Sequence, residues 1–158
     1  MLIIRVAVIN SFKKEYGDNT YLLDTIKDEI IRKRIDSNLK WYICKAVKAK
    51  RWYYIFSSTT IVAPIISGII ISINNLNKGS ISLVSALIMA LSSISASFLN
   101  LFDLKMKWSL YRNQTEVIKR YLIMYSASED KSDIELLKDI EESIQKTDRK
   151  WTEKLKKE

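Results

Sequence analysis

The chain has 158 residues, with 26 Lys and Arg against 18 Asp and Glu, a formal net charge of +8 and no histidine. The absence of histidine excludes imidazole catalysis, the lone Cys44 excludes an internal disulfide and a thiolate metal site, and three glycines cannot build a Gly-rich phosphate loop. These counts leave open a hydrolase that uses carboxylates alone, but the sequence pairs no carboxylates in an apolar setting. We therefore predict no enzyme activity, no bound metal and no cofactor.

Charge is strongly segregated along the chain. No Asp or Glu lies between Asp36 and Asp103, residues 52–77 carry no charge, and residues 79–102 are again uncharged after Lys78. Two long uncharged stretches with charged flanks are typical of membrane spans rather than of a soluble domain with one shared core.

Residues 1–19 receive no predicted function. The first nine are apolar apart from Arg5, which is too short a stretch to cross a bilayer, and the basic residues follow it instead of preceding it as in a signal peptide. A short amphipathic anchor, a strand and an incorrectly assigned start all remain open.

Residues 20–158 are predicted to form a single domain that opens with a cytoplasmic helix over about 20–52. Apolar residues recur there every three or four positions and define one face: Ile31, Ile35, Leu39, Tyr42, Ala46, Ala49 and Tyr53. Turn-forming residues from Gly17 to Thr20 predict its start, and the helix is expected to continue into the membrane.

The first transmembrane span is predicted at about 53–73. At about 1.5 Å per residue it is about 31 Å long, which matches a hydrocarbon core of about 30 Å. Trp52, Tyr53 and Tyr54 stand at its cytoplasmic end, where amphipathic rings favour the headgroup level. Pro64 leaves the Thr60 carbonyl without its usual donor; we expect the Ser57–Thr60 run to bond freed carbonyls, so that the helix is kinked rather than broken.

A polar turn at 74–79 and a second span at about 80–102 complete an antiparallel hairpin. The turn carries only Lys78, whereas the flanks carry the basic residues Lys45, Lys48, Lys50, Arg51, Lys105 and Lys107. The positive-inside rule therefore predicts a multi-pass inner-membrane protein with both termini in the cytoplasm. Cations beside apolar spans indicate anionic lipid as the partner, not nucleic acid.

Two further cytoplasmic helices are predicted, at about 103–126 and 133–156. The first has a heptad face of Leu104, Trp108, Tyr111, Thr115, Ile118, Leu122 and Tyr125. Ser132 and Glu135 form a capping box for the second, whose buried face is expected to be Leu137, Ile140, Ile144, Trp151 and Leu155. The predicted fold class is all-α: an integral membrane hairpin of two transmembrane helices with long cytoplasmic helical extensions.

Small and polar residues follow a helical stripe in the second span: Ser82, Ala86, Ala90, Ser93, Ser97 and Asn100. Small residues allow close helix packing in lipid, so the stripe either packs the hairpin's own two helices or faces other subunits, or water, in an assembled pore. In the first span we expect the small residues Ala63, Ser67, Gly68 and Ser72 to meet the second span.

The most specific pattern, Trp108–x–x–Tyr111–Arg112–x–x–x–Glu116, directly follows the second span. Arg112 and Glu116 are one helical turn apart and can pair, and the aromatic residues suit either helix packing or the membrane interface. This pattern resembles the SLATT superfamily, two-transmembrane effector domains associated with bacterial nucleotide-signalling and conflict systems. The resemblance covers about residues 35–155 and includes Trp41, Tyr42, the alternating Ala and Lys of 45–50, the aromatic residues 52–54, Pro64 and Trp151.

The chain departs from that family where members often carry a second acidic residue one turn further on, because Arg120 and Tyr121 occupy the region. The subfamily therefore stays open. The resemblance implies an all-α membrane effector of antiphage defence. Such effectors oligomerise, or change conformation, when a separately encoded sensor or nucleotide synthase responds to infection, and then permeabilise the inner membrane.

Three functions follow for testing. The first is an oligomeric pore or membrane-disrupting effector with the stripe facing the assembly interior. The second is a non-conducting membrane scaffold that docks a cytoplasmic partner through its helical faces. The third is a nucleotide-responsive channel in which Lys105, Lys107 and Arg112 meet phosphates.

Overall fold

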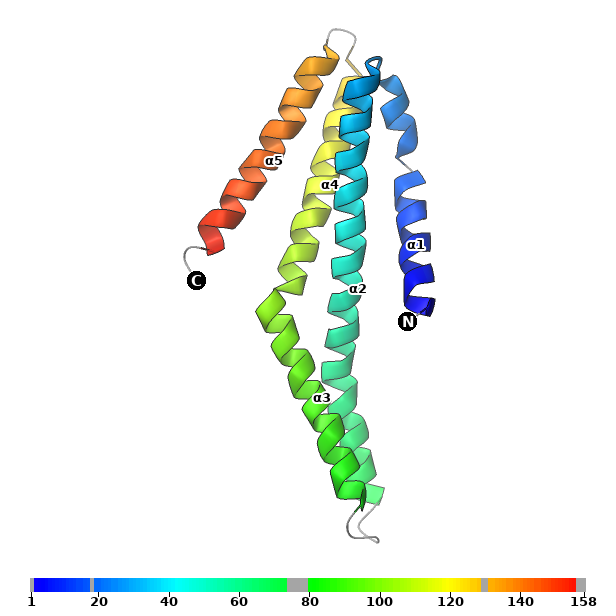
Figure 1. Ribbon diagram of the computed structural model, residues 1–158, viewed down its shortest axis with the longest axis vertical. Helices are drawn as coiled ribbons and strands as arrows, with labels where there is room; N and C mark the ends of the chain where they lie inside the picture. The colour runs from blue at the N-terminus through cyan, green and yellow to red at the C-terminus, as the bar shows by residue number, and fades with distance from the viewer. Residues whose placement is uncertain (1, 18, 74–79, 129–130, 156–158) are drawn as a thin grey trace. The chain divides into compact units, whose positions relative to one another are not determined.

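The computed structural model describes residues 2–17, 19–73, 80–128 and 131–155, except for the side chains of 2–9, 73, 80–82, 150, 154 and 155. All regular structure in these residues is helical (Figure 1): α1 (Leu2–Gly17), the 3₁₀ helix η1 (Thr20–Thr25), α2 (Glu29–Ile73), α3 (Ser80–Phe102), α4 (Leu104–Ser126) and α5 (Asp133–Leu155). The predicted all-helical class is thus confirmed. The polar turn predicted at 74–79 lies outside the described residues.

The chain divides into two compact units. The bundle unit contains residues 1–47 and 108–158, and the hairpin unit contains residues 48–107. Helix α2 contributes to both units. Residues 20–158, predicted to form a single domain, thus contribute to both units, and residues 2–17, for which no function was predicted, form α1 in the bundle unit.

Helix α2 begins at Glu29, and the helix predicted from residue 20 is two elements instead. Asp28 is the N-cap: its Oδ1 accepts hydrogen bonds from the backbone N–H groups of Ile30 (2.8 Å) and Ile31 (3.1 Å). The preceding 3₁₀ helix stops at Ile26, whose backbone is extended. A cap that satisfies two free N–H groups determines where the long helix starts.

The core of the bundle unit forms where the apolar faces of α2 and α4 meet. Ile35, Leu39 and Ile43 of α2 and Ile118 and Leu122 of α4 are fully buried. Burying one such side chain contributes about 1.5–3 kcal/mol. Of the predicted faces, Ile35, Leu39, Ile118 and Leu122 are therefore confirmed as buried, whereas Ile43 and η1, which packs Leu22 and Leu23 against them, were not predicted.

Helix α5 starts at the predicted capping box. The Ser132 N–H donates to Glu135 Oε2 (3.4 Å), and the Glu135 N–H donates to Ser132 Oγ (3.3 Å). Its most buried residues are Leu136 and Ile140, whereas Leu137 and Ile144 are only partly buried. The face that packs therefore includes Leu136, which the predicted face omitted; of that face, Trp151 is partly buried and the Leu155 side chain is not described.

In the hairpin unit, residues 48–73 of α2 pack beside α3 through small residues. Ala63 and Ser67 are buried, and the Ser67 hydroxyl donates to the backbone carbonyl of Ser85 on α3 (3.1 Å). Gly68 and Ser72 are exposed, contrary to expectation, and the Ser72 hydroxyl donates to the Gly68 carbonyl of its own helix. One of the two predicted small-residue pairs therefore makes the contact.

Pro64 lies inside α2, and the helix continues past it. Proline has no N–H to donate to the Thr60 carbonyl, and the hydroxyl of Ser92 on α3 donates to that carbonyl at 3.1 Å. We had expected the local Ser57–Thr60 run to satisfy freed carbonyls. Instead the hydroxyls of Thr59 and Thr60 bond the carbonyls of Ile55 and Phe56, so the neighbouring helix supplies the missing donor.

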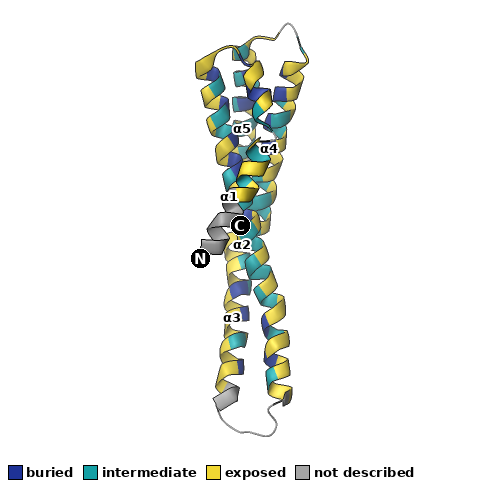
Figure 2. Ribbon diagram, turned by 90° about the vertical axis from the view of Figure 1, so that its right-hand side faces the viewer, coloured by how far each residue is buried: buried dark blue, intermediate teal, exposed yellow. Residues whose placement is uncertain are grey.

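Two helices are long and apolar enough to cross a membrane, one within Glu29–Ser72 and one within Leu83–Phe102. Only 6% and 17% of their most apolar windows are buried, which differs from the core helix of a soluble protein. Figure 2 shows exposed residues along most of α3 and the second part of α2. Asp103 then separates α3 from α4 with φ 45°, a left-handed conformation that Asp tolerates better than most residues.

Candidate functional site

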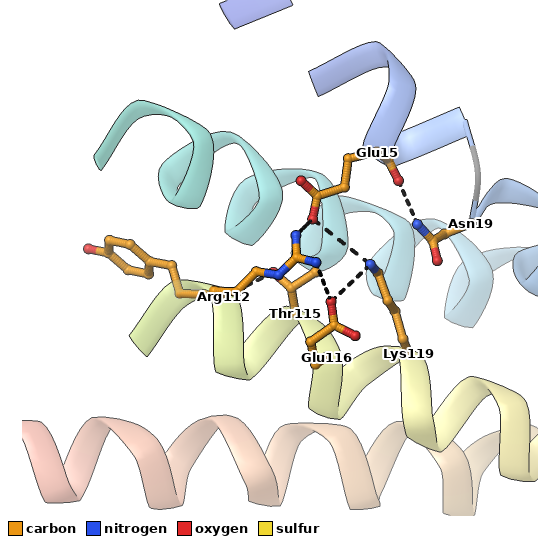
Figure 3. Close-up of polar contacts among 7 residues, drawn as sticks. Glu15, Asn19, Arg112, Thr115, Glu116 and Lys119 are labelled. Atoms are coloured by element: carbon orange, nitrogen blue, oxygen red, sulfur yellow. Dashed lines mark hydrogen bonds and ion pairs between the residues drawn. The ribbon is translucent and has the colours of Figure 1, made fainter. Parts of the chain in front are cut away.

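An ion-pair network joins α4 to the end of α1 in the bundle unit (Figure 3). Arg112 contacts Glu15 of α1 through Nη1 and Glu116 of α4 through Nη2, the latter at 2.9 Å. Lys119 Nζ lies 3.3 Å from the same Glu116 oxygen and 3.9 Å from Glu15 Oε1. Two cations and two carboxylates therefore alternate and neutralise one another.

The burial of this network is uneven. The side chains of Lys119 and Glu15 are 13% and 21% exposed, whereas those of Arg112 and Glu116 are 47% and 46% exposed. A sheltered ammonium needs paired carboxylates, because a lone charge in that position would cost much more than an exposed one. Asn19, just after α1, donates a hydrogen bond from Nδ2 to the backbone carbonyl of Glu15 at 2.5 Å and so stabilises the end of α1 beside the network.

Tyr111 of the motif packs against two aromatic rings of α2. The Tyr111 ring meets Trp41 edge to face, with centroids 5.7 Å apart, and lies 6.3 Å from the Tyr42 ring. Lys45 Nζ lies 5.4 Å above the Trp41 ring. Burial, with smaller contributions from Asp148, Tyr111 and Glu141, raises the pKa of Tyr42 to about 12, so this hydroxyl stays protonated at neutral pH.

A cleft of about 530 Å³ opens beside the network. Its walls combine the basic side chains Arg112, Lys119 and Arg120 with the exposed apolar side chains of Tyr21, Ile123 and Met124. Glu116 is the one acidic residue among the described residues that line it. The cleft can hold a ligand or peptide with both apolar and anionic groups.

A polar layer is buried between α4 and α5. Gln114 is 1% exposed; its Nε2 donates to Ser143 Oγ (3.2 Å), and its Oε1 accepts from Thr147 Oγ1 (2.8 Å). A buried amide with both ends satisfied aligns two helices, because a slip of either helix would leave it unpaired. These residues border a second cleft of about 250 Å³.

Asp133 connects three segments at one end of the bundle unit. Its Oδ1 accepts from the Tyr125 hydroxyl, and its Oδ2 accepts from the Asp28 N–H at 2.7 Å. The Tyr125 hydrogen bond, helped by the Asp28 N–H and by Lys27, lowers the pKa of Asp133 below its ordinary value of 3.8. The carboxylate is therefore ionised and structural at neutral pH.

The predicted stripe lies on the outside of the hairpin unit. Ala86, Ala90, Ser93, Ser97 and Asn100 are all exposed, and the Ser82 side chain is outside the described set. Among the described side chains of α3, Ser85, Ser92 and Ser95 are the buried ones. The Ser93 and Ser97 hydroxyls donate to Met89 and Ser93 carbonyls of their own helix, at 3.3 and 2.9 Å.

The predicted basic residues lie at the ends of the apolar segments. Lys45, Lys48, Lys50 and Lys105 are exposed, and Arg51 and Lys107 are partly buried. Lys107 Nζ lies 5.7 Å above the Phe102 ring. Trp108, the first residue of the motif, is partly buried at the start of the α4 segment in the bundle unit.

Sequence reasoning paired Arg112 with Glu116 correctly but missed Glu15 and Lys119. Lys119 follows Glu116 by three positions, a spacing that predicts a helical neighbour. Glu15 lies 97 residues from Arg112 along the chain, and only the packing of α1 brings the two together. In the described residues, no group of three or more His, Cys, Asp or Glu side chains is placed to hold a metal ion.

No curated protein and no solved structure is detectably similar to the chain. One family does match, over residues 37–131, which includes most of α2, all of α3 and α4, and the Trp108–Glu116 motif. The chain therefore belongs to the family described as "Protein of unknown function (DUF4231)".

Proposed function

We propose that this protein is a membrane effector of a bacterial antiphage or conflict system, whose hairpins oligomerise and permeabilise the inner membrane when a partner or nucleotide signal triggers them. The observation that carries the proposal is that the stripe of small and polar residues on α3 is not the face that packs against α2. Ser93, Ser97 and Asn100 remain exposed while Ser85, Ser92 and Ser95 already pack against α2.

Membrane insertion of the hairpin unit is supported by its exposed apolar surface. Large side chains on both helices are exposed, among them Ile61, Ile65, Ile69, Leu83, Leu87, Leu91 and Ile94. Water disfavours an apolar surface of this extent, whereas lipid tails accommodate it. The excess of cations at the flanks, against Lys78 alone in the turn, favours a topology with both termini in the cytoplasm.

Oligomerisation is supported by the small and polar side chains that stay exposed on one face of α3. The Ser93 and Ser97 hydroxyls are satisfied within α3, and the Asn100 amide, near the cytoplasmic end of the proposed span, can bond a neighbouring helix. Small residues beside it let another helix approach closely. A second copy of the hairpin can cover this row, and several copies can turn it toward a water-filled path, since one hairpin cannot enclose a pore.

The effector role extends the resemblance of the Trp108–Glu116 motif to the SLATT superfamily. Its partner would be a separately encoded sensor or nucleotide synthase, received by the bundle unit. The cleft beside Arg112 and Arg120 is where such a partner can reach the motif.

The test replaces the small residues of the row. Ser93→Leu and Ser97→Leu should prevent assembly, so triggered cells should keep their membrane potential, measured with a potential-sensitive dye. Leu87→Ile is the matched control, because Leu87 is exposed on α3 outside the row; it should behave as wild type. If triggered cells lost their membrane potential with all three variants, the pore would be contradicted. It would also be contradicted if triggered cells with the wild-type chain kept their membrane potential.

The second candidate is a non-conducting scaffold that docks a cytoplasmic partner, and the exposed apolar residues of the cleft favour it. Tyr21, Ile123 and Met124 are more than half exposed. For a scaffold, Ile123→Glu should abolish partner binding, and Ser93→Leu should leave both binding and function intact. Function that survives Ser93→Leu but not Ile123→Glu would therefore replace the pore with the scaffold.

A further inference from the structure

An aromatic ladder crosses from α2 to α3 in the hairpin unit. Trp52 stacks on Phe56 with centroids 5.6 Å apart, Phe56 on Phe98 at 5.3 Å, and Phe98 on Phe102 at 5.2 Å. The angles between successive ring planes are 21°, 11° and 22°, so the rings are nearly parallel. Trp52, Phe98 and Phe102 are 49%, 40% and 41% exposed, which leaves one side of the ladder uncovered.

In the sequence a lysine precedes the first ring of the ladder by one helical turn, and another follows the last ring. Lys107 Nζ lies 5.7 Å above the Phe102 ring, and this contact holds the ammonium beside the last ring. Lys48 is exposed and precedes Trp52 by four positions, so the two lie on one face of α2. The uncovered face therefore changes from apolar rings to ammonium groups at the basic end of the unit.

The charge at this end has almost no counter-charge within the unit. Residues 48–107 contain the cations Lys48, Lys50, Arg51, Lys105 and Lys107 near the two ends of this stretch and Lys78 in its middle, against the single acid Asp103. A ligand that fits must supply negative charge beside the lysines and an apolar body along the rings. An anionic phospholipid has both parts, and free inorganic phosphate lacks the second.

We infer that Lys48, Lys107 and the ladder Trp52–Phe56–Phe98–Phe102 form a binding site for an anionic phospholipid. This inference rests on the proposed membrane insertion of the hairpin. The headgroup lies between the two lysines, and an acyl chain follows the exposed edges of the rings. Bound lipid then holds α2 and α3 together at the end of the hairpin, where Phe56 and Phe98 already touch.

The test uses the full chain with phosphatidylglycerol or phosphatidylcholine, and native mass spectrometry measures lipid bound in detergent. Both lipids carry a phosphate, so their difference reports net negative charge. We expect wild type to prefer phosphatidylglycerol by about tenfold or more, since each juxtamembrane lysine contributes about fivefold. Lys48→Gln with Lys107→Gln should remove most of that preference, and Phe98→Leu should weaken binding of both lipids.

The control is Lys13→Gln with Lys14→Gln, which removes the same charge from exposed positions on α1. It should keep the preference for phosphatidylglycerol. Equal loss in this control, or no preference in wild type, would overturn the site. Flotation of the chain with vesicles after a carbonate wash tests insertion separately. A chain that floats but shows no lipid preference would contradict only this inference. A chain that does not float with the vesicles would also contradict the proposed function.

Discussion

Arg112 lies between two carboxylates of different origin, Glu116 one turn along its own helix and Glu15 on α1. The local pair belongs to the helix and forms wherever the helix forms. The pair with Glu15 exists only when α1 is docked, so it reports the tertiary structure. Lys119, mostly sheltered, depends on the same two carboxylates for its counter-charge.

A double-mutant cycle with Glu15→Gln and Arg112→Gln should reveal a coupling of up to about 1 kcal/mol in the free energy of unfolding, because the pair is partly exposed and screened by solvent. Chemical denaturation followed by tryptophan fluorescence measures it. The Glu29–Lys33 pair, whose side chains are 66% and 75% exposed, is the control and should give about 0.3–0.5 kcal/mol. A coupling no larger than the control's would mean that Glu15 does not hold α1.

Asp133 makes the bundle unit sensitive to acid. Its pKa is lower in the folded than in the unfolded state, so its contribution to stability is present above about pH 4 and is lost as the pH falls through the lowered folded value. Unfolding free energies measured from pH 5 down to pH 2 should therefore fall less steeply for Asp133→Asn than for wild type. Parallel curves for the two proteins would contradict this assignment.

At the scale of elements, the hairpin is held by serines that serve the backbone of the neighbouring helix. Ser92 donates to the Thr60 carbonyl that Pro64 leaves free, and Ser67 donates to the Ser85 carbonyl. A proline in a helix costs a hydrogen bond, and in an apolar surrounding that loss must be made good by another donor. The proline and Ser92 thus form a functional pair across two helices.

Ser92→Ala should destabilise the hairpin by about 0.6 kcal/mol, the average for hydrogen bonds between helices in membranes, and by no more than about 1.7 kcal/mol. The cost should shrink when Pro64→Ala is also present, because residue 64 then has an N–H that can donate to the Thr60 carbonyl. Ser95→Ala is the control, since the Ser95 hydroxyl donates to Leu91 of its own helix at 2.8 Å. If Ser92→Ala lowered the free energy of unfolding equally in the presence and absence of Pro64, Ser92 would not be compensating for the proline. Denaturation in mixed micelles supplies the free energies.

At the scale of the whole molecule, the two units have different surfaces. In the bundle unit the apolar faces of the helices are buried in a shared core, and ion pairs join neighbouring helices. In the hairpin unit large apolar side chains are exposed on both helices. The bundle unit thus has the surface of a water-soluble domain, whereas the exposed apolar surface of the hairpin unit suits lipid, which is what the proposed function requires of each unit.

Matched lysine substitutions test this division. Ile66→Lys places a charge on the exposed apolar surface of α2 and should reduce membrane insertion by about 2.5–3.5 kcal/mol, scored by carbonate extraction. Ile134→Lys is the control, because Ile134 is 72% exposed on α5 in the bundle unit. Equal extraction of both variants would show that the hairpin is not in lipid.

Features that depend on residue spacing and local chemistry could be predicted from the sequence alone. These include the all-helical class, two apolar helices of spanning length, the buried faces of α2 and α4, the Ser132–Glu135 capping box and the Arg112–Glu116 pair. Each is set by residues within a few positions of one another, so helical periodicity is enough to predict it.

Contacts between residues far apart in the sequence, by contrast, follow from how the helices pack. Helix packing brings Glu15 to Arg112, Ser92 to the Thr60 carbonyl and Phe56 to Phe98. It also leaves Ser93 and Ser97 exposed while Ser92 is buried. Neighbouring serines on one helix are alike in composition and spacing. Their roles differ because the rotation of α3 against α2 follows from packing of the whole interface, which no short stretch of sequence encodes.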